Sequence, residues 1–219
     1  MSNPWTFGWT QVLTIIGFII TISIAFGGFR TFERWKREKI EERKMEIAYD
    51  FLALAYESKY VFDVIRSPVS FGSEYESMPR RPDESDVEWN RRGPYYAILK
   101  RVEAHKDFFD RVFKIQPKCM AVFGESAEEI FLLVHRARRE IEVSAQMLAW
   151  RDGFGTEASE QMQRDIWDHG DFEREKDKVG EKLRSFRSKA EALCTNALKV
   201  QRKQPSTWRM KFRRHLIGN

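Results

Sequence analysis

The pattern of hydrophobic and polar positions divides the chain near residue 30. The run Val12–Phe29 contains only apolar or small residues, and no ionisable side chain precedes Arg30. A helix of about 20 apolar residues matches the roughly 30 Å hydrocarbon core of a bilayer. Aromatic rings, which are stable at the depth of the lipid headgroups, precede the run at positions 5, 7 and 9. The pattern predicts a short N-terminal segment and one transmembrane helix over about residues 9–29.

The distribution of Lys and Arg predicts the orientation of this helix. No basic side chain occurs in residues 1–11, whereas residues 30–44 contain seven. A cleaved signal peptide, the competing interpretation, has the opposite order, with its basic region before the apolar run. Because Lys and Arg favour the cytoplasmic side, we expect the N-terminus outside and residues 30–219 in the cytoplasm. The basic residues expected at the membrane surface are Arg30, Arg34, Lys36 and Arg37.

Beyond the apolar run the hydrophobic positions recur at helical spacing. The first stripe, Ile47, Phe51, Leu54, Ser58, Val61 and Ile65, follows spacings of four and three residues, so the transmembrane helix is predicted to continue to Ser67-Pro68. Comparable stripes recur around residues 95–116, 130–148 and 172–200, the last in nearly heptad register, as in a coiled coil, and a short helix is expected over 157–168. Four long segments with narrow apolar stripes are typical of an antiparallel helical bundle. The predicted fold is all-α, with the bundle over residues 30–200.

Local signals set the expected breaks between these helices. Residues 67–94 hold four prolines, two glycines and no sustained period, which predicts a disordered or mobile surface loop. Pro94 suits the first turn of the following helix, and Pro117 is expected to kink or end it. Ser126 and Glu129 have the spacing of a capping box and predict the start of the next helix.

Charge and cysteine usage narrow the classes of function. The net charge is +5, of which residues 1–46 carry +2, residues 201–219 carry +6 and the remainder −3. A nucleic-acid-binding domain would more often concentrate positive charge on its body, so nucleic acid is not the expected partner. Cys119 and Cys194, the two cysteines, are isolated and are interpreted as small buried apolar groups. The sequence contains no zinc-ligand spacing or phosphate-binding loop, and no cofactor is expected.

Two segments could mediate contacts with lipid or protein. Within the apolar run, small residues recur on one helix face at Thr14, Gly17, Thr21, Ala25 and Gly28, and such faces let transmembrane helices approach closely. This predicts a homo-oligomer or a partner membrane protein, although Gly and Thr are also common in isolated transmembrane helices. The basic tail, residues 201–219, is predicted to bind anionic lipid headgroups, with nucleic-acid binding or a solvated end as alternatives. Its candidate membrane-surface residues are Trp208, Arg209, Lys211, Phe212, Arg213 and Arg214.

One sequence pattern suggests an enzymatic activity. Arg164 and His169 are separated by four residues, with a polar residue after the arginine. This spacing resembles the R-x4-6-H motif of the HEPN superfamily of helical-bundle ribonucleases, in which Arg and His act together on the RNA backbone. Arg209 and His215 also fit the loose form of the motif, so the spacing alone is not specific. The alternative function is therefore a membrane-tethered ribonuclease that uses Arg164 and His169.

Longer segments support a different resemblance. The stretches GWTQVLTIIGFIITISIAFGGFRTFERWKREKIEERKMEIA, FDVIRSPVSFGSE, FFDRVFKIQPKCMAVFG and IFLLVHRARREIEVSAQMLAW resemble a family of uncharacterised, single-pass bacterial membrane proteins with a cytoplasmic helical domain. The resemblance covers residues 8 to about 151. It implies a bacterial source and a location in the cytoplasmic (inner) membrane, and it transfers no activity. The favoured interpretation is a non-enzymatic scaffold or interaction module at the inner face of that membrane.

Overall fold

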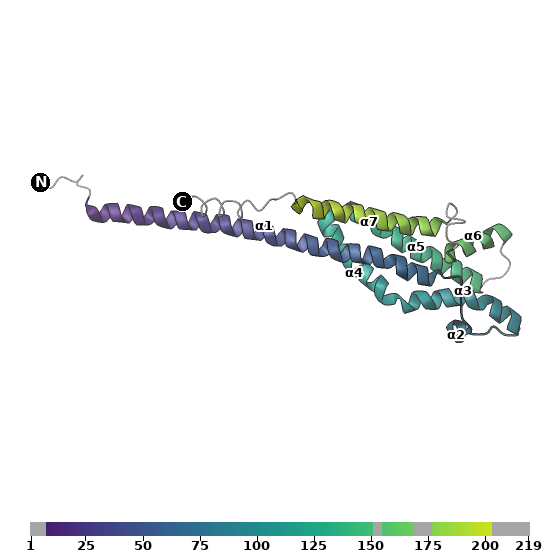
Figure 1. Ribbon diagram of the computed structural model, residues 1–219. Coiled ribbons are helices and arrows are strands. Elements are labelled where there is room, and N and C mark those ends of the chain that lie inside the picture. Colours follow the sequence, from purple (N-terminus) through teal and green to yellow (C-terminus); the bar gives the residue numbers. More distant parts are fainter. Residues whose placement is uncertain (1–7, 151–154, 169–176, 203–219) are drawn as a thin grey trace, which may run out of the picture. The chain divides into compact units, whose positions relative to one another are not determined.

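The computed structural model describes residues 8–150, 155–168 and 177–202, and every regular element in these ranges is a helix (Figure 1). The predicted all-α class is therefore confirmed for the described part of the chain. The helices are α1 (Trp9–Ile65), α2 (Gly72–Tyr75), α3 (Asp86–Ala104), α4 (Lys106–Phe123), α5 (Glu125–Trp150), α6 (Thr156–Ile166) and α7 (Lys178–Arg202). The chain divides into two compact units, Met1–Met45 and Glu46–Asn219, with the boundary inside α1.

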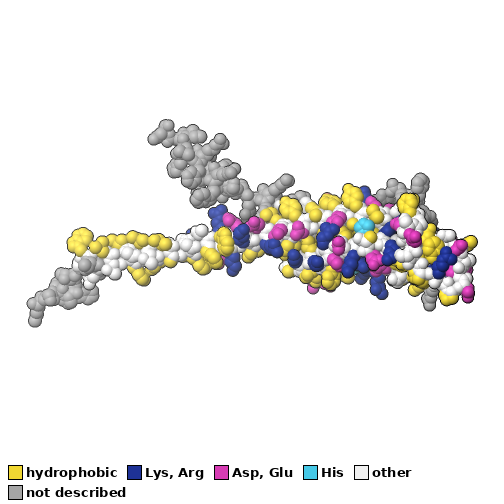
Figure 2. All heavy atoms as spheres, turned by 90° about the horizontal axis from the view of Figure 1, so that it is seen from below, with side chains coloured by type: hydrophobic (Ala, Val, Ile, Leu, Met, Phe, Trp, Pro, Cys, Tyr) yellow, Lys and Arg dark blue, Asp and Glu magenta, His cyan; other side chains and the backbone are white. Residues whose placement is uncertain are grey.

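The first unit consists of the N-terminal part of α1. Every described side chain from Gln11 to Arg30 is exposed, including Phe18 at 68% and Ile24 at 70% of its full area. This segment is long and apolar enough to cross a membrane by length and composition. Figure 2 shows hydrophobic and uncharged atoms over it, and Lys and Arg first appear where the apolar run ends.

The second unit is built around a single hydrophobic core. The C-terminal part of α1 supplies the predicted stripe, and all six of its members, from Ile47 to Ile65, are buried. Phe51 stacks on Phe131 of α5 with ring centroids 4.7 Å apart, and its edge contacts Phe186 of α7 at 6.1 Å. Helix α5 contacts α3, α4, α6 and α7, so it lies at the centre of the unit (Figure 1). Its predicted stripe is also confirmed, since Ile130, Val134, Ala137, Ile141 and Ala145 are buried.

The prediction of a loop over residues 67–94 is wrong for residues 86–94, which belong to α3. Helix α3 begins at Asp86, where Ser85 caps it: the Ser85 hydroxyl accepts from the Glu88 amide, and the Glu88 carboxylate accepts from the Ser85 amide. Pro94 lies well inside α3 rather than in its first turn. In the first part, α2 forms a short turn of helix, and Met78 is buried at 4% exposure. Outside α2, residues 67–85 have no regular secondary structure, and Met78 is the residue that they bury.

The predicted helix over residues 95–116 is also divided differently. The break falls at His105, and α4 continues through Pro117 to Phe123. Phe113 lies within the predicted helix but is 71% exposed. Helix α4 ends at Gly124, whose φ of 70° is accessible to glycine at low cost. Helix α5 then starts at Glu125, so Ser126 lies inside the helix instead of capping it.

Candidate functional site

Three buried arginines connect the helices of the second unit. Arg66, Arg92 and Arg101 are 3%, 1% and 8% exposed as whole residues, and each one binds a carboxylate together with backbone carbonyls near the end of a helix. The last carbonyls of a helix lack partners within the helix, and a guanidinium group has five N–H donors in a fixed geometry. We call these sites the arginine junctions.

The Arg66 junction joins α1 to α6 and α7. The Arg66 Nη2 donates to the carbonyls of Arg164 and Trp167, at 3.0 and 2.9 Å, and the guanidinium forms a bidentate pair with Asp177 at 2.8 and 3.0 Å. Asp177 also caps α7, because its carboxylate accepts from the Gly180 amide at 2.8 Å. A single arginine therefore stabilises the end of one helix and the start of the next.

The Arg92 and Arg101 junctions hold the segment between α1 and α3. Arg92 pairs with Glu84, with Nη2 to Oε2 at 2.6 Å, and donates to the Ala149 carbonyl near the end of α5 at 3.0 Å. Arg101 pairs with Glu74 of α2 and donates to the Ser67 and Val69 carbonyls beyond the end of α1. The hydrogen bond from Arg101 lowers the pKa of the Glu74 carboxyl.

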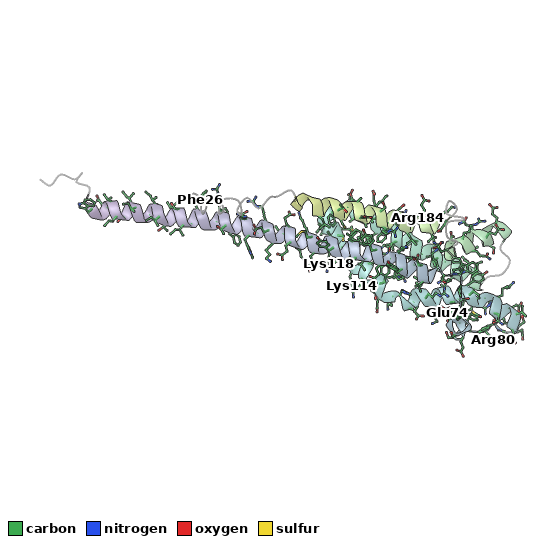
Figure 3. All side chains as sticks on the ribbon, in the orientation of Figure 1. Phe26, Glu74, Arg80, Lys114, Lys118 and Arg184 are labelled. Atoms are coloured by element: carbon green, nitrogen blue, oxygen red, sulfur yellow. The ribbon has the colours of Figure 1, made fainter. Side chains whose placement is uncertain are left out.

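A cavity lies beside the Arg66 junction, between α1 and α7, with a volume of about 310 Å³. Its basic side chains are Lys59 of α1, Arg66 directly after α1, and Arg184 and Arg187 of α7; Figure 3 labels Arg184 on its helix. Its acidic side chains are Asp63, Asp168 and Asp177. We call this space the Arg66 cavity.

Acidic and basic side chains both line the Arg66 cavity and affect one another's protonation. Burial raises the pKa of the Asp63 carboxyl and the neighbouring Asp168 raises it further, while Lys59, Arg187 and Arg66 lower it. Arg66 and Asp177 neutralise each other across the bidentate pair. Among the described residues, the other charged side chains that line the cavity are three cations and two acids, so this part of its lining carries excess positive charge.

A second hollow of about 360 Å³ lies between α1 and α4. Arg111, Lys114 and Lys118 line it from α4, and Figure 3 labels the two lysines on this helix. Arg111 makes a bidentate pair with Glu57 of α1 across the hollow. The two lysines give this second surface a basic character similar to that of the Arg66 cavity.

The predicted ribonuclease residues are only partly described by the structure. Arg164 lies in the last turn of α6, where its guanidinium is 3.3 Å from the Glu160 carboxylate and its carbonyl accepts from Arg66. The polar residue after it, Asp165, faces α5 and accepts from the Ser144 hydroxyl at 3.2 Å. His169 lies outside the described residues. The pairing of Arg164 with His169 therefore stays a prediction, which a ribonuclease assay of the intact chain and its His169→Ala variant would test.

The predicted contact residues of the first unit are all at its surface. The small-residue face, Thr14, Gly17, Thr21, Ala25 and Gly28, is exposed along its whole length. Among the basic residues, Arg30 lies over the Phe26 ring at 5.4 Å and Arg34 pairs with Glu38 at 3.0 Å, while Lys36 and Arg37 are exposed. The candidate tail residues Trp208, Arg209, Lys211, Phe212, Arg213 and Arg214 lie outside the described residues.

The interpretation of both cysteines as small buried groups is confirmed. Cys119 and Cys194 are free thiols with no exposed area. Burial raises the pKa of Cys119 to about 12 and that of Cys194 to about 11, so both thiols stay protonated and unreactive near neutral pH. Within the described ranges, no group of three or more His, Cys, Asp or Glu side chains has an arrangement that could hold a metal ion.

The fold and these sites define an all-helical protein with one candidate membrane-spanning helix and a helical unit stabilised by buried arginines. Comparison of the chain with models of protein families, with curated proteins and with solved structures gave no match. The resemblance to single-pass bacterial membrane proteins therefore stays a prediction.

Proposed function

We propose that this protein is a membrane-anchored interaction module of the bacterial cytoplasmic membrane. The N-terminal part of α1 spans the bilayer with the N-terminus outside, and the remaining helices form an antiparallel bundle on the cytoplasmic side. One observation carries the proposal: an uncharged apolar segment with every described side chain exposed is followed at once by a basic cluster that starts at Arg30. Lipid chains are the solvent in which such a surface is stable, and the basic cluster favours the cytoplasmic leaflet.

The hydroxyl groups of the segment support this environment. Thr21 and Ser23 donate to carbonyls four residues earlier, at 2.9 and 2.8 Å, so these hydroxyls have partners within the helix itself. In hydrocarbon a hydroxyl without a partner costs several kcal/mol, roughly 4 or more on alkane transfer scales. The segment therefore enters lipid without leaving these donors unsatisfied.

The small-residue face is the proposed site of helix association. A Cβ atom added at Gly17 or at Gly28 would meet no other atom within 4 Å, so backbone is accessible on this side of the helix. Close approach of two backbones gains van der Waals contact, which is a main source of helix association in lipid. The partner is a second copy of this chain or the helix of another membrane protein.

The second unit supplies the proposed docking platform. Its arginine junctions connect helix ends that are distant in sequence, and a set of fixed helices presents a constant surface to a partner. Confinement by the anchor raises the local concentration of that surface at the membrane, which strengthens binding without new contacts. The basic tail would add contacts with anionic lipid headgroups. The role is positional and requires no chemical step.

Crosslinking with mass spectrometry on native membranes tests the interaction role. The intact chain is compared with a Gly17→Ile/Gly28→Ile variant and with a control, Ile15→Val/Ile24→Val, that changes other exposed positions of the same helix. We expect crosslinks to a second copy or to one recurrent neighbour, reduced at least fivefold in the glycine variant and unchanged in the control. A monomeric protein with no recurrent neighbour would contradict the proposal.

A further inference from the structure

Among the described residues of the Arg66 cavity, basic side chains outnumber the acidic ones. Lys59 of α1 and Arg184 and Arg187 of α7 line the same space of about 310 Å³. Two acids, Asp63 and Asp168, oppose these three cations, whereas Asp177 is already neutralised by Arg66. A volume of this size is at the small end of the range for ligand-binding pockets.

Arg66 lies at the edge of the cavity and is almost fully occupied by contacts within the protein. Arg66 is 3% exposed, and four of its contacts use Nη1 and Nη2. Its Nε has no hydrogen-bond partner among the described residues, although it is buried. A buried donor without an acceptor is unfavourable, so most buried N–H groups in proteins have a partner. Because this Nε has almost no accessible area, the cationic groups that can contact a molecule in the cavity are those of the other lining side chains.

We propose that the Arg66 cavity binds a small molecule through a phosphate group, which Arg184, Arg187 and Lys59 hold. Guanidinium groups suit this ligand because their parallel N–H donors match the oxygens of a phosphate. A phosphate dianion also offsets the excess positive charge of the walls. Asp63 and Asp168 accept hydrogen bonds from hydroxyl or ammonium groups elsewhere on the same molecule. The binding site is a property of the second unit and does not depend on the proposed membrane anchoring.

Titration calorimetry on the full chain in nanodiscs tests this proposal. In the first arm, inorganic phosphate or glycerol 1-phosphate is titrated into the protein in nanodiscs of neutral lipid. In the second arm, phosphatidic acid is the probe, supplied in the nanodisc lipid with no free phosphate in the buffer. The Arg184→Gln/Arg187→Gln variant removes two cations from the cavity. Its matched control is Lys114→Gln/Lys118→Gln, which removes two cations from the hollow between α1 and α4.

We expect saturable binding of a phosphate probe that weakens at least tenfold in the Arg184/Arg187 variant and changes less than twofold in the control. Binding of the soluble probes identifies a free phosphate compound as the ligand, and an effect confined to the phosphatidic acid arm identifies a lipid headgroup. Absence of saturable binding in both arms, or equal weakening in the variant and the control, overturns the proposal.

A variant that is expected to strengthen phosphate binding tests the site even if the double arginine variant does not fold. Asp63→Asn removes one of the two acids that repel an anion while leaving the cations in place. With inorganic phosphate as the probe, which has no second group for Asp63 to bind, we expect this variant to bind about threefold to tenfold more tightly. Unchanged or weaker binding by Asp63→Asn would contradict the site.

Discussion

The two units of this protein place their apolar and polar groups in opposite environments. In the first unit the apolar side chains are outside, with Ile24 70% exposed, and the hydroxyls of Thr21 and Ser23 turn back onto the helix. In the second unit Phe51 and Phe131 are fully buried, and buried arginines bind carboxylates and carbonyls from other helices.

The two units also differ in where their polar groups find hydrogen-bond partners. An unpaired polar group is expensive in a protein core, and it would be equally expensive in the lipid that we propose surrounds the first unit. The first unit satisfies its groups locally, within one turn of helix, and therefore needs no neighbour. The second satisfies them at long range, as between Arg66 and Asp177, so its helices depend on one another.

The largest expected effect comes from charging the exposed apolar surface. Ile19→Arg/Ile20→Arg places two charges near the middle of the apolar run, at a cost of about 2.5–3.5 kcal/mol each in a transmembrane helix. Because both isoleucines are exposed, with relative areas of 56% and 53%, the change removes no core packing. We expect the protein to leave the carbonate-resistant membrane fraction. Ile19→Leu/Ile20→Leu is the control, and an arginine variant that stays in that fraction would break the comparison.

The next effect is the loss of a long-range junction. Arg66→Met leaves the Asp177 carboxylate, 15% exposed, without its partner and removes donors from two carbonyls. Breaking a buried pair from one side typically costs about 3–5 kcal/mol. Chemical denaturation of the second unit should show a loss of this size, against less than about 0.5 kcal/mol for Lys59→Met at an exposed position of α1. Equal stabilities would mean that the junction is not a structural requirement.

A smaller effect is expected from the glycine at the start of α7. A Cβ at Gly180 would lie 1.9 Å from the Asp177 Oδ2, so Gly180→Ala must displace the carboxylate that pairs with Arg66. Overpacking of this kind costs roughly 1–3 kcal/mol. Gly155→Ala is the control, because a Cβ there meets nothing within 4 Å. A thermal denaturation midpoint lowered only by Gly180→Ala would sharpen the account, and equal midpoints would oppose it.

The smallest effect is a pH dependence at the Arg101 junction. The hydrogen bond from Arg101 lowers the pKa of Glu74 below its ordinary value of 4.5, so the folded state favours the ionised carboxyl. This stabilisation is present above pH 4.5 and is lost as the pH falls through the lowered pKa. Wild type should therefore be more stable than Glu74→Gln near neutrality, with the difference shrinking in acid. Denaturation at several pH values, with the exposed Glu76→Gln as control, measures it; a difference independent of pH would count against the pair.

Much of the helical pattern could be predicted from the sequence, because local periodicity carries it. The stripe from Ile47 to Ile65 follows one helix face, and its members are buried as expected. The start of α3 differs from the prediction because Pro94, a residue typical of the first turn of a helix, lies in the interior of this one. Ser85 and Glu88 already had the capping-box spacing that identifies the true start.

The arginine junctions could not be predicted in the same way. Arg66 and Asp177 are 111 residues apart, and nothing local distinguishes this arginine from the others in a chain rich in Lys and Arg. Arg101 gave a weak signal, since it lies between Ile98 and Val102 on the apolar face of its helix. The Arg66 cavity depends on the same long-range packing, so its residues were not among the sequence-based candidates.

Cysteine labelling on intact bacterial cells tests the central claim, the membrane-spanning orientation of α1, most directly. The native thiols Cys119 and Cys194 are fully buried, so single cysteines introduced by Ser2→Cys or Lys36→Cys report alone. A membrane-impermeant maleimide should label Ser2→Cys in intact cells and Lys36→Cys only after lysis. Labelling of Lys36→Cys in intact cells, or recovery of the unmodified chain in the soluble fraction, would contradict the account.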